Sequence, residues 1–186
     1  MPLSHSFTVA AKGGVLRVLA TGCSVSQAFH PSGGGTAPAS FPFTAIWDTG
    51  ATASVITQQV VDACGLQPIG MTQVHGVNSI TDCEVYLVNI AGPNGVTFPN
   101  IRVTKNKLTG ADVLIGMDII TVGDFSVTNK GGVTIFSFRV PSQHHVDYVQ
   151  DARDANALLT SNKFRHGGSG KERRRRGKKF GANKGK

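Results

Sequence analysis

Residues 41–57 read FPFTAIWDTGATASVIT, an apolar run that ends in an aspartate and becomes apolar again after a small, Gly-containing turn. The run 41–47 predicts a buried strand, and the composition of the turn predicts that the chain changes direction at its end. Burying a carboxylate costs free energy unless it is paired, hydrogen-bonded or neutralised. Asp48, at the end of the predicted strand, is therefore the residue that calls for an explanation.

Asp48-Thr49-Gly50 has the composition of a loop that can fix a reactive carboxylate. Gly50 lets the backbone turn sharply and brings amide N–H groups close to the carboxylate, and the Thr49 hydroxyl can hydrogen-bond a neighbouring backbone group. One carboxylate fixed in this way can accept a proton but cannot also hold one ready. Two carboxylates within hydrogen-bond reach can do both, because like charges that close share one proton.

The chain contains Asp-Thr-Gly once in 186 residues. Asp112, Asp118 and Asp124 lack the Thr-Gly that would shape a second loop of this kind. A two-lobed monomer is therefore excluded, and a paired site needs a C2 homodimer in which two Asp48 side chains meet on the axis.

Three features resemble the retroviral-type (retropepsin-like) aspartic proteases. They are Ala45–Ala51 (AIWDTGA), Val113–Asp118 (VLIGMD), which is followed by a predicted short helix, and the Gly-containing hairpin Val74–Thr81. The resemblance implies an all-β fold, a closed β-barrel of the acid protease type with one lobe per chain. It also implies an aspartic endopeptidase that acts on peptide or protein substrates and needs neither a cofactor nor a metal.

The same resemblance assigns the candidate site residues. The catalytic loop is Asp48, Thr49 and Gly50. The residues expected to bind substrate are Ala51 and Thr52 after the catalytic loop and, on the flap that covers it, Gly76, Val77, Asn78, Ser79 and Ile80. Support for the loop falls on Leu114, Ile115, Gly116 and Asp118.

Two positions depart from the family pattern. Thr52-Ala53-Ser54 stands where the family often has an Asp that contacts the substrate backbone, so substrate choice does not carry over. Trp47 is bulkier than the aliphatic residue that is common before the catalytic Asp, and packing against the core and against a partner subunit both remain open.

Simpler structural interpretations of the same residues also remain open. Asp48 can be a turn residue that caps its own loop, and Asp118 a helix cap or a buried hydrogen-bond acceptor. His144 and His145 are adjacent on a predicted loop, without a third ligand in metal-site spacing. The alternative function is a peptide-binding or scaffold module that uses the same cleft without hydrolysis and is tethered to nucleic acid by a basic tail.

Local patterns predict the remaining elements. Apolar runs at 7–11 and 15–20 around Gly13-Gly14 predict a hairpin, and Pro99 predicts that the strand 96–103 lies at a sheet edge. Helical periodicity predicts a short helix over 57–64 and an amphipathic helix over 146–159. We therefore expect a protease domain over 1–140, a helical extension over 141–162 and a disordered basic tail over 163–186.

Charge is distributed unevenly along the chain. The net charge is +8, yet residues 163–186 hold eleven Lys or Arg and one Glu, while residues 1–162 hold eight Lys or Arg against ten Asp or Glu. A dense basic run such as 171–179 binds polyanions by releasing their counterions, so weak contact of 171–186 with nucleic acid or an anionic surface is one interpretation. A solvated tail that aids solubility is the other.

The cysteines and the hydropathy of the chain indicate in which cellular compartment the protein is expected. Three cysteines without tight spacing indicate neither a disulfide framework nor a metal site, and no apolar run approaches the length of a membrane span. We expect a cytoplasmic protein.

Overall fold

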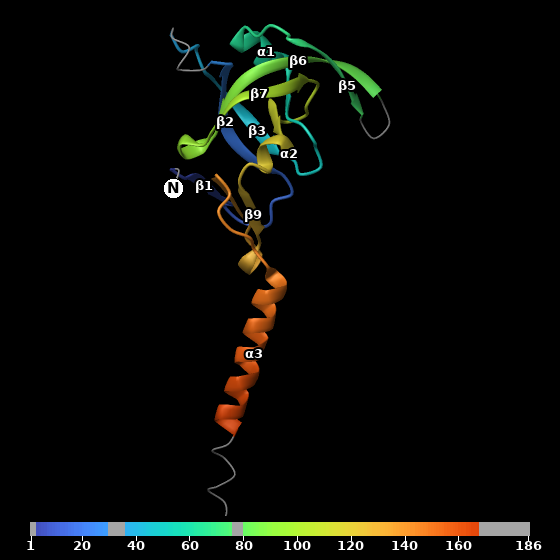
Figure 1. Ribbon diagram of the computed structural model, residues 1–186. Coiled ribbons are helices and arrows are strands. Elements are labelled where there is room, and N and C mark those ends of the chain that lie inside the picture. Colours follow the sequence, from blue (N-terminus) through green and yellow to red (C-terminus); the bar gives the residue numbers. More distant parts are fainter. Residues whose placement is uncertain (1–2, 30–35, 76–79, 168–186) are drawn as a thin grey trace, which may run out of the picture. The chain divides into compact units, whose positions relative to one another are not determined.

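Most strands in the described residues belong to one sheet (Figure 1). The computed structural model describes residues 3–29, 36–75 and 80–167. The chain divides into two units, Met1–His144 and His145–Lys186, and each is treated by itself below.

The elements of the described residues are as follows. The strands are β1 (His5–Ala10), β2 (Leu19–Gln27), β3 (Phe41–Trp47), β4 (Val55–Ile56), β5 (Gly70–His75), β6 (Ile80–Ala91), β7 (Thr97–Lys105), β8 (Val113–Ile115), β9 (Asp124–Thr128) and β10 (Ile135–Val140). The helices are α1 (Gln58–Cys64), α2 (Met117–Ile120) and α3 (Tyr148–Gly167), with single 3₁₀ turns η2 (Pro93–Gly95) and η3 (Lys130–Gly132).

The large sheet has the order β2-β3-β8-β4-β7-β6-β5, and β2 also pairs with β6. This extra pairing closes the strands from β2 to β6 into a ring, which is consistent with the expected barrel, and leaves β5 outside it. The unit is built from strands with two short helices, so the all-β prediction is confirmed. The short helix expected after the 113–116 strand is also present, as α2.

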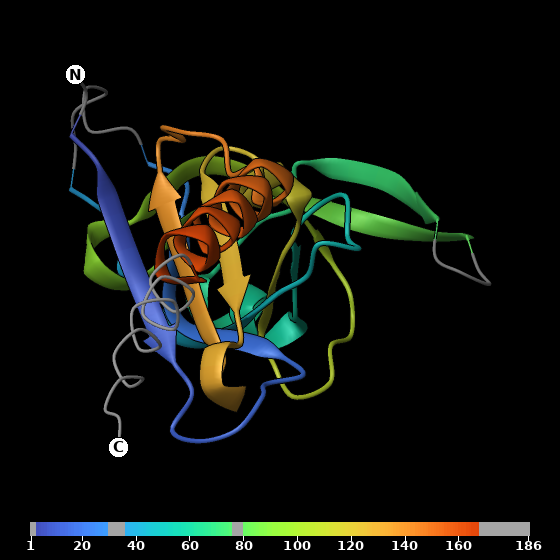
Figure 2. The same ribbon diagram turned by 90° about the horizontal axis from the view of Figure 1, so that it is seen from below.

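A second, three-stranded sheet has the order β1-β10-β9 (Figure 2). The predicted hairpin between residues 7–11 and 15–20 is therefore wrong, because β1 pairs with β10 instead of β2. The side chain of Phe7 is 3% exposed among aromatic residues of β10, whereas Val15 and Val18 are exposed. Burial of Phe7 thus decides the partner of β1, and residues 11–18 form a loop.

Trp47 packs in the protein's own core, at the contact between the two sheets. Its ring centroid lies 5.0 Å from that of Phe138, 5.3 Å from Phe136 and 5.7 Å from Phe7. Its indole N–H donates to the buried hydroxyl of Thr21 on the neighbouring strand β2, at 3.0 Å. Trp47 is therefore a core residue that joins the end of β3 to the three-stranded sheet.

Strand β7 is an interior strand and not the edge strand predicted from Pro99, because it pairs with β6 and, at Thr104 and Lys105, also with β4. The β6–β7 register shifts between Val88 and Ile90, because Pro99 and Asn100 both lie opposite Asn89 and form a bulge in β7. Asn100 has a φ of 55° and donates its backbone N–H to the Asn89 side chain at 2.8 Å. A bulge tolerates a residue without an N–H, so the Pro fits in an interior strand.

Helix α1 confirms the helix expected over 57–64. Gly65 ends it in the left-handed conformation, with a φ of 59°, and its N–H donates to the carbonyl of Asp62. The helix turns its apolar side, Val60, Val61 and Cys64, into the core.

The second unit contains α3. Asp147 caps the start of this helix, because its carboxylate accepts the N–H groups of Val149 at 2.9 Å and Gln150 at 3.1 Å. The helix continues to Gly167, beyond the expected boundary at 162, because no Pro or Gly interrupts the chain before that residue. Within the described residues, no helix combines the length and the apolar character that a membrane span requires.

Candidate active site

The Asp48 loop begins where β3 ends. The Asp48 N–H donates to the carbonyl of Ile115 at 2.9 Å, which extends the parallel β3–β8 pair by one residue. The side chain is half-buried, and its Oδ1 accepts the N–H of Gly50 at 2.8 Å. The N–H of Ala51 donates to the Asp48 carbonyl at 3.2 Å. The loop therefore folds back on its own carboxylate, as a fixed proton acceptor requires.

The segment after β8 lies against this loop. The N–H of Met117 donates to the carbonyl of Ala51 at 2.8 Å, and the N–H of Asp118 donates to that of Thr52 at 3.2 Å. A Cβ on Gly116 would lie 2.7 Å from the carbonyl carbon of Ala53, so a side chain at 116 would displace the loop. Gly116 thus permits the close approach of two backbones.

Asp118 and Ser54 form the polar contact between the two segments. The Asp118 carboxylate accepts the Ser54 N–H at 3.0 Å and the Ser54 hydroxyl at 2.8 Å. The Ser54 oxygen in turn accepts the N–H of Gly116 at 3.0 Å. Asp118 is thus an acceptor for another segment and not the N-cap of α2, which is Gly116. Ser54 was missed among the candidate residues, because in the sequence it reads only as the start of a strand.

Three aliphatic side chains lie beside the loop, on neighbouring strands. Ile46 pairs with Leu114, and Leu114 pairs with Val55, so the three residues are cross-strand neighbours on adjacent strands. All three are half-buried, while the residues on either side of them in sequence on β3 and β8 are buried in the core. They therefore form an apolar row on the face opposite the core, near Asp48. Ile115, the other expected support residue, is 1% exposed and packs inward.

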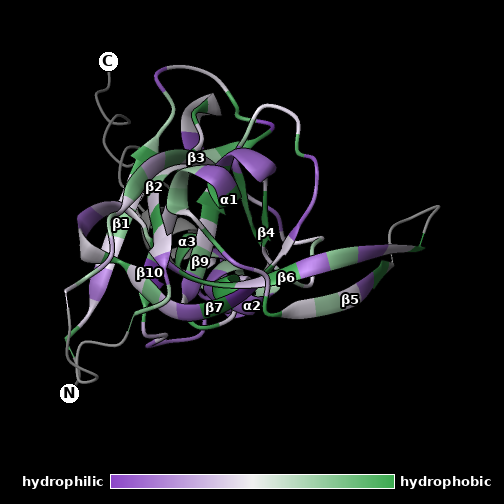
Figure 3. Ribbon diagram, turned by 90° about the horizontal axis from the view of Figure 1, so that it is seen from above, coloured by the Kyte–Doolittle hydropathy of each residue, from purple (hydrophilic) through white to green (hydrophobic). Residues whose placement is uncertain are grey.

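The β5–β6 hairpin projects from the ring (Figure 3). Its register pairs His75 with Ile80, so the connection between the strands is residues 76–79. The expected flap residues Gly76, Val77, Asn78 and Ser79 lie outside the described residues. Ile80 is 64% exposed and Met71 is 63% exposed, so the hairpin offers apolar side chains that are not packed in the core.

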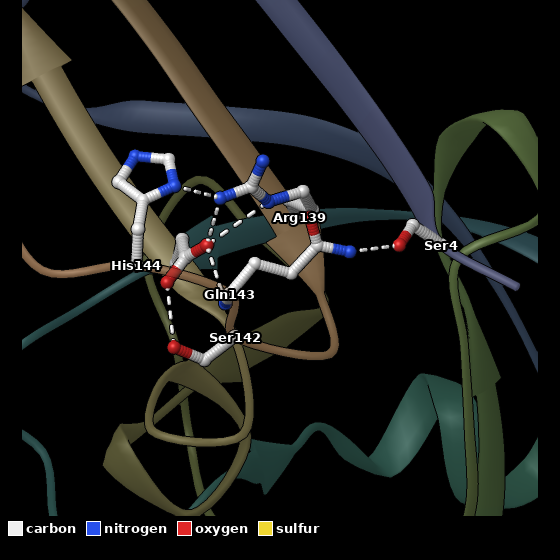
Figure 4. Close-up of polar contacts among 6 residues, drawn as sticks. Ser4, Arg139, Ser142, Gln143 and His144 are labelled. Carbon is white, nitrogen blue, oxygen red and sulfur yellow. Dashed lines mark hydrogen bonds and ion pairs between the residues drawn. The ribbon is translucent and has the colours of Figure 1, made fainter. Parts of the chain in front are cut away.

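A second polar cluster lies at the start of β9 (Figure 4). Asp124 accepts from Arg139 Nε at 2.9 Å, from the Ser142 hydroxyl at 2.6 Å and from the Gln143 N–H at 3.1 Å. The Ser142 hydroxyl and, after it, Arg139 lower the pKa of Asp124 from 3.8 to about 2. Arg139 also contacts His144 Nδ1 at 2.6 Å. These contacts hold the chain after β10 against the start of β9.

In the part of the chain that the structure describes, metal-ligating side chains and a large cavity point to no further site at the Asp48 loop. Among the described residues, no group of three or more His, Cys, Asp or Glu is placed to hold a metal ion. A cavity of about 840 Å³ is lined by Thr44, residues 57–59 and residues 105–112. Its lining contains no residue of the 48–54 loop, so this cavity is separate from the candidate active site.

Comparison with known families bears on the same segment. Residues 39–121, which include the Asp48 loop, β8 and α2, match the family model described as a gag-polyprotein putative aspartyl protease. This match agrees with a resemblance of these residues to the retropepsin-like aspartic proteases. The resemblance inferred from the sequence is thereby confirmed, and the retropepsin-like segment covers most of the ring of strands.

Solved structures match this chain at low identity. A retropepsin-like aspartic protease from Rickettsia conorii matches with a TM-score of 0.45 and 11% identity, over 75% of this chain and 98% of that one. The retroviral protease-like domain of Ddi1 from Leishmania major matches with a TM-score of 0.40 and 16% identity, over 66% of this chain and 95% of that one. Comparison with the curated proteins gives no match.

Proposed function

We propose that the protein is an aspartic endopeptidase whose active site forms in a homodimer from two Asp48 carboxylates. The observation that carries the proposal is the Asp48 loop: a half-buried carboxylate at a strand end, hydrogen-bonded by the Gly50 N–H at 2.8 Å, within a segment of the aspartyl protease family. The Asp-Thr-Gly motif occurs once in the chain, so the second carboxylate comes from a second copy.

The chemistry follows from one proton shared by two carboxyl groups. The ionised Asp48 takes a proton from a water molecule as its oxygen bonds to the scissile carbonyl carbon, while the protonated Asp48 hydrogen-bonds the carbonyl oxygen. The tetrahedral intermediate then collapses, the C–N bond breaks, and the leaving nitrogen receives a proton from a carboxyl group. Thr49 and Gly50 hold the loop, and no covalent intermediate forms with the enzyme.

An extended peptide is the substrate class that the surroundings of Asp48 support. Ala51 and Thr52 follow the carboxylate and would contact the substrate backbone, and the β5–β6 hairpin would cover it as a flap. The row of Ile46, Leu114 and Val55 favours an apolar side chain near the scissile bond, since burying such a side chain there removes apolar surface from water.

The test is peptide cleavage by Asp48→Asn in the full chain, with a peptide library as substrate. We expect no cleavage, because the amide cannot take the proton from water, and an unchanged fold and dimer. Asp112→Asn is the matched control: Asp112 is also half-buried and accepts a backbone N–H, from Thr44 at 3.0 Å, but lies outside the loop. Cleavage by Asp48→Asn at the wild-type rate would overturn the proposal.

The same experiment separates the alternative function, a module that binds peptide without hydrolysis. Such a module would bind library peptides and leave them intact, whether residue 48 is Asp or Asn. Sedimentation or light scattering supplies the second criterion, because a strict monomer that does not cleave favours the alternative. Activity of the dimer should also fall at both pH extremes, since the pair must hold one proton.

Partners and location beyond the site are also proposals. The charge of residues 163–186 supports a weak, salt-sensitive contact with nucleic acid or another polyanion. Retention of the full chain on an RNA matrix at low salt, lost on deleting residues 168–186, would support it, whereas equal elution of the two forms would exclude it. The three cysteines are free and buried, which supports a cytoplasmic location.

A further inference from the structure

Among residues 48–54, the Asp48 loop, Ser54 is the only fully buried residue. Its exposure is 0%, whereas Asp48 and Ala51 are half-buried and Thr49, Gly50, Thr52 and Ala53 are exposed. Side-chain packing therefore contributes little to the position of residues 48–53. Residues 48–53 are therefore held mainly by hydrogen bonds to residues 115–118, and the bonds of Ser54 are among these.

Both ends of the loop are attached to the same segment, residues 115–118. At the first end the Asp48 N–H donates to the Ile115 carbonyl. At the other end Ser54 donates its N–H and its hydroxyl to the two carboxylate oxygens of Asp118 and accepts the Gly116 N–H. Backbone bonds also join Ala51 and Thr52 to this segment, so Ser54 is the attachment of the loop that depends on a side chain.

We propose that Ser54 is a positioning residue that fixes the distance between the Asp48 loop and the turn Gly116–Asp118, and thereby the orientation of the Asp48 carboxylate. The proposal rests on the proposed function, because it assigns Ser54 a role in that site. Ser54 touches neither substrate nor the reacting atoms and acts through the backbone of residues 48–53.

The bonding pattern shows what a residue without a hydroxyl at position 54 would lose. Loss of the hydroxyl leaves the buried Gly116 N–H without its acceptor and removes one donor from the Asp118 carboxylate. Asp118 keeps its bonds to the backbone N–H groups of Ser54 and of its own neighbour Ile119, the latter at 3.0 Å, so its carboxylate stays in place. The expected response is a small shift of the loop and not loss of the fold. Because displacement of a reacting group by about 1 Å can lower a rate about 100-fold, such a shift should be visible in kcat.

The experiment compares Ser54→Ala with Thr134→Val in the full chain. Thr134 is the matched control, since it is also 0% exposed and its hydroxyl also makes two bonds, accepting from the Leu16 N–H at 2.8 Å and donating to Asn129 at 2.6 Å. We expect Ser54→Ala to lower kcat by about 10- to 100-fold with KM changed less than about twofold. The two variants should lower Tm by similar amounts, and Thr134→Val should leave kcat per folded enzyme unchanged.

A second measurement keeps the proposal independent of cleavage. Hydrogen exchange at the amides of residues 48–53 should be faster in Ser54→Ala than in the wild type, and unchanged in Thr134→Val. If the wild type cleaves nothing, the proposed function fails, while faster exchange confined to Ser54→Ala still supports Ser54 as the attachment of the loop. Equal hydrogen exchange at residues 48–53 in the two variants, or an unchanged kcat in Ser54→Ala, would overturn the positioning role of Ser54.

Asp118→Asn provides a variant that keeps the volume of the side chain. It replaces one carboxylate oxygen by an amide group that donates, so one of the two bonds from Ser54 is lost. If Ser54→Ala does not fold, Asp118→Asn should show the same fall in kcat and faster exchange at 48–53. Wild-type values of both quantities in Asp118→Asn would overturn the proposal.

Discussion

Trp47 stacks on Phe125, with ring centroids 6.2 Å apart and an angle of 29° between the rings. Trp47 ends β3 in the large sheet and Phe125 lies on β9 in the small one, so this pair joins the two sheets next to the start of the Asp48 loop. Trp47→Ala should therefore lower the free energy of unfolding by about 3–5 kcal/mol, the usual loss for a large buried aromatic residue. Urea denaturation measures it. Tyr148→Ala, at a side chain that is 67% exposed, is the control and should change it by less than about 0.5 kcal/mol.

Gly116→Ala should impair activity more than stability. The new Cβ would lie 2.7 Å from the Ala53 carbonyl carbon and 3.0 Å from the Ala51 carbonyl oxygen, so the Asp48 loop must move. We expect cleavage to fall by about 100-fold in a protein that still folds. Gly22→Ala is the control on β2, where an added Cβ meets no atom within 4 Å. Equal activity of the two variants would show that the loop can adapt to the side chain.

Thr57→Val should stabilise the protein. The Thr57 hydroxyl oxygen is buried without a hydrogen-bond partner among the described residues, although Thr57 is the N-cap of α1. Its backbone is extended, with a φ of −87° and a ψ of 167°, which suits Val. Removing an unpaired buried hydroxyl should raise the free energy of unfolding by about 1 kcal/mol. Thr134→Val, which removes a paired hydroxyl, should lower the free energy of unfolding. A change of the same sign in both variants would contradict the conclusion that the Thr57 hydroxyl is unpaired.

Asp124 should make stability depend on acid. Its pKa in the folded protein is about 2 against an ordinary value of 3.8, so its contribution is complete above about pH 4 and is lost as the pH falls through 2. Asp124→Asn should therefore be less stable than the wild type by about 1 kcal/mol at pH 6, after allowance for solvent screening, and nearly equal at pH 2.

The pH dependence of this difference is the diagnostic, measured by urea denaturation at several pH values. Ser137→Ala is an uncharged control in the same sheet, paired with the hydroxyl of Thr8 at 2.8 Å, and should change stability by an amount independent of pH. A difference for Asp124→Asn that stays constant from about pH 6 to about pH 2 would show that the charge of Asp124 contributes little.

Local sequence carried much of the fold near the catalytic loop. The apolar run before Asp48, the Gly after it and the Val113–Asp118 element are short patterns, and each could be recognised without knowing its partners. Ser54 could not, because its role depends on bonds to Gly116 and Asp118, at sequence separations of 62 and 64.

The errors have the same origin. Gly13-Gly14 between apolar runs is a good local signal for a hairpin, but the partner of β1 lies at the other end of the unit. The position of β7 inside the ring and the bulge at Pro99 also depend on strands distant in sequence. Local rules could not decide these points, since tertiary burial selects among the pairings that local patterns allow.

The pairing of β1 with β10 has a consequence for synthesis. His5 pairs with Val140, so the first strand of the chain must wait for the last strand of its unit to leave the ribosome. Until then Phe7 and Trp47 lack their contacts with Phe136 and Phe138. Pairing over such a sequence distance slows folding, because the entropy of closing the loop is lost before the contacts form. The nascent chain therefore carries exposed aromatic residues until β10 has left the ribosome, and the pairing of β1 with β10 then buries them.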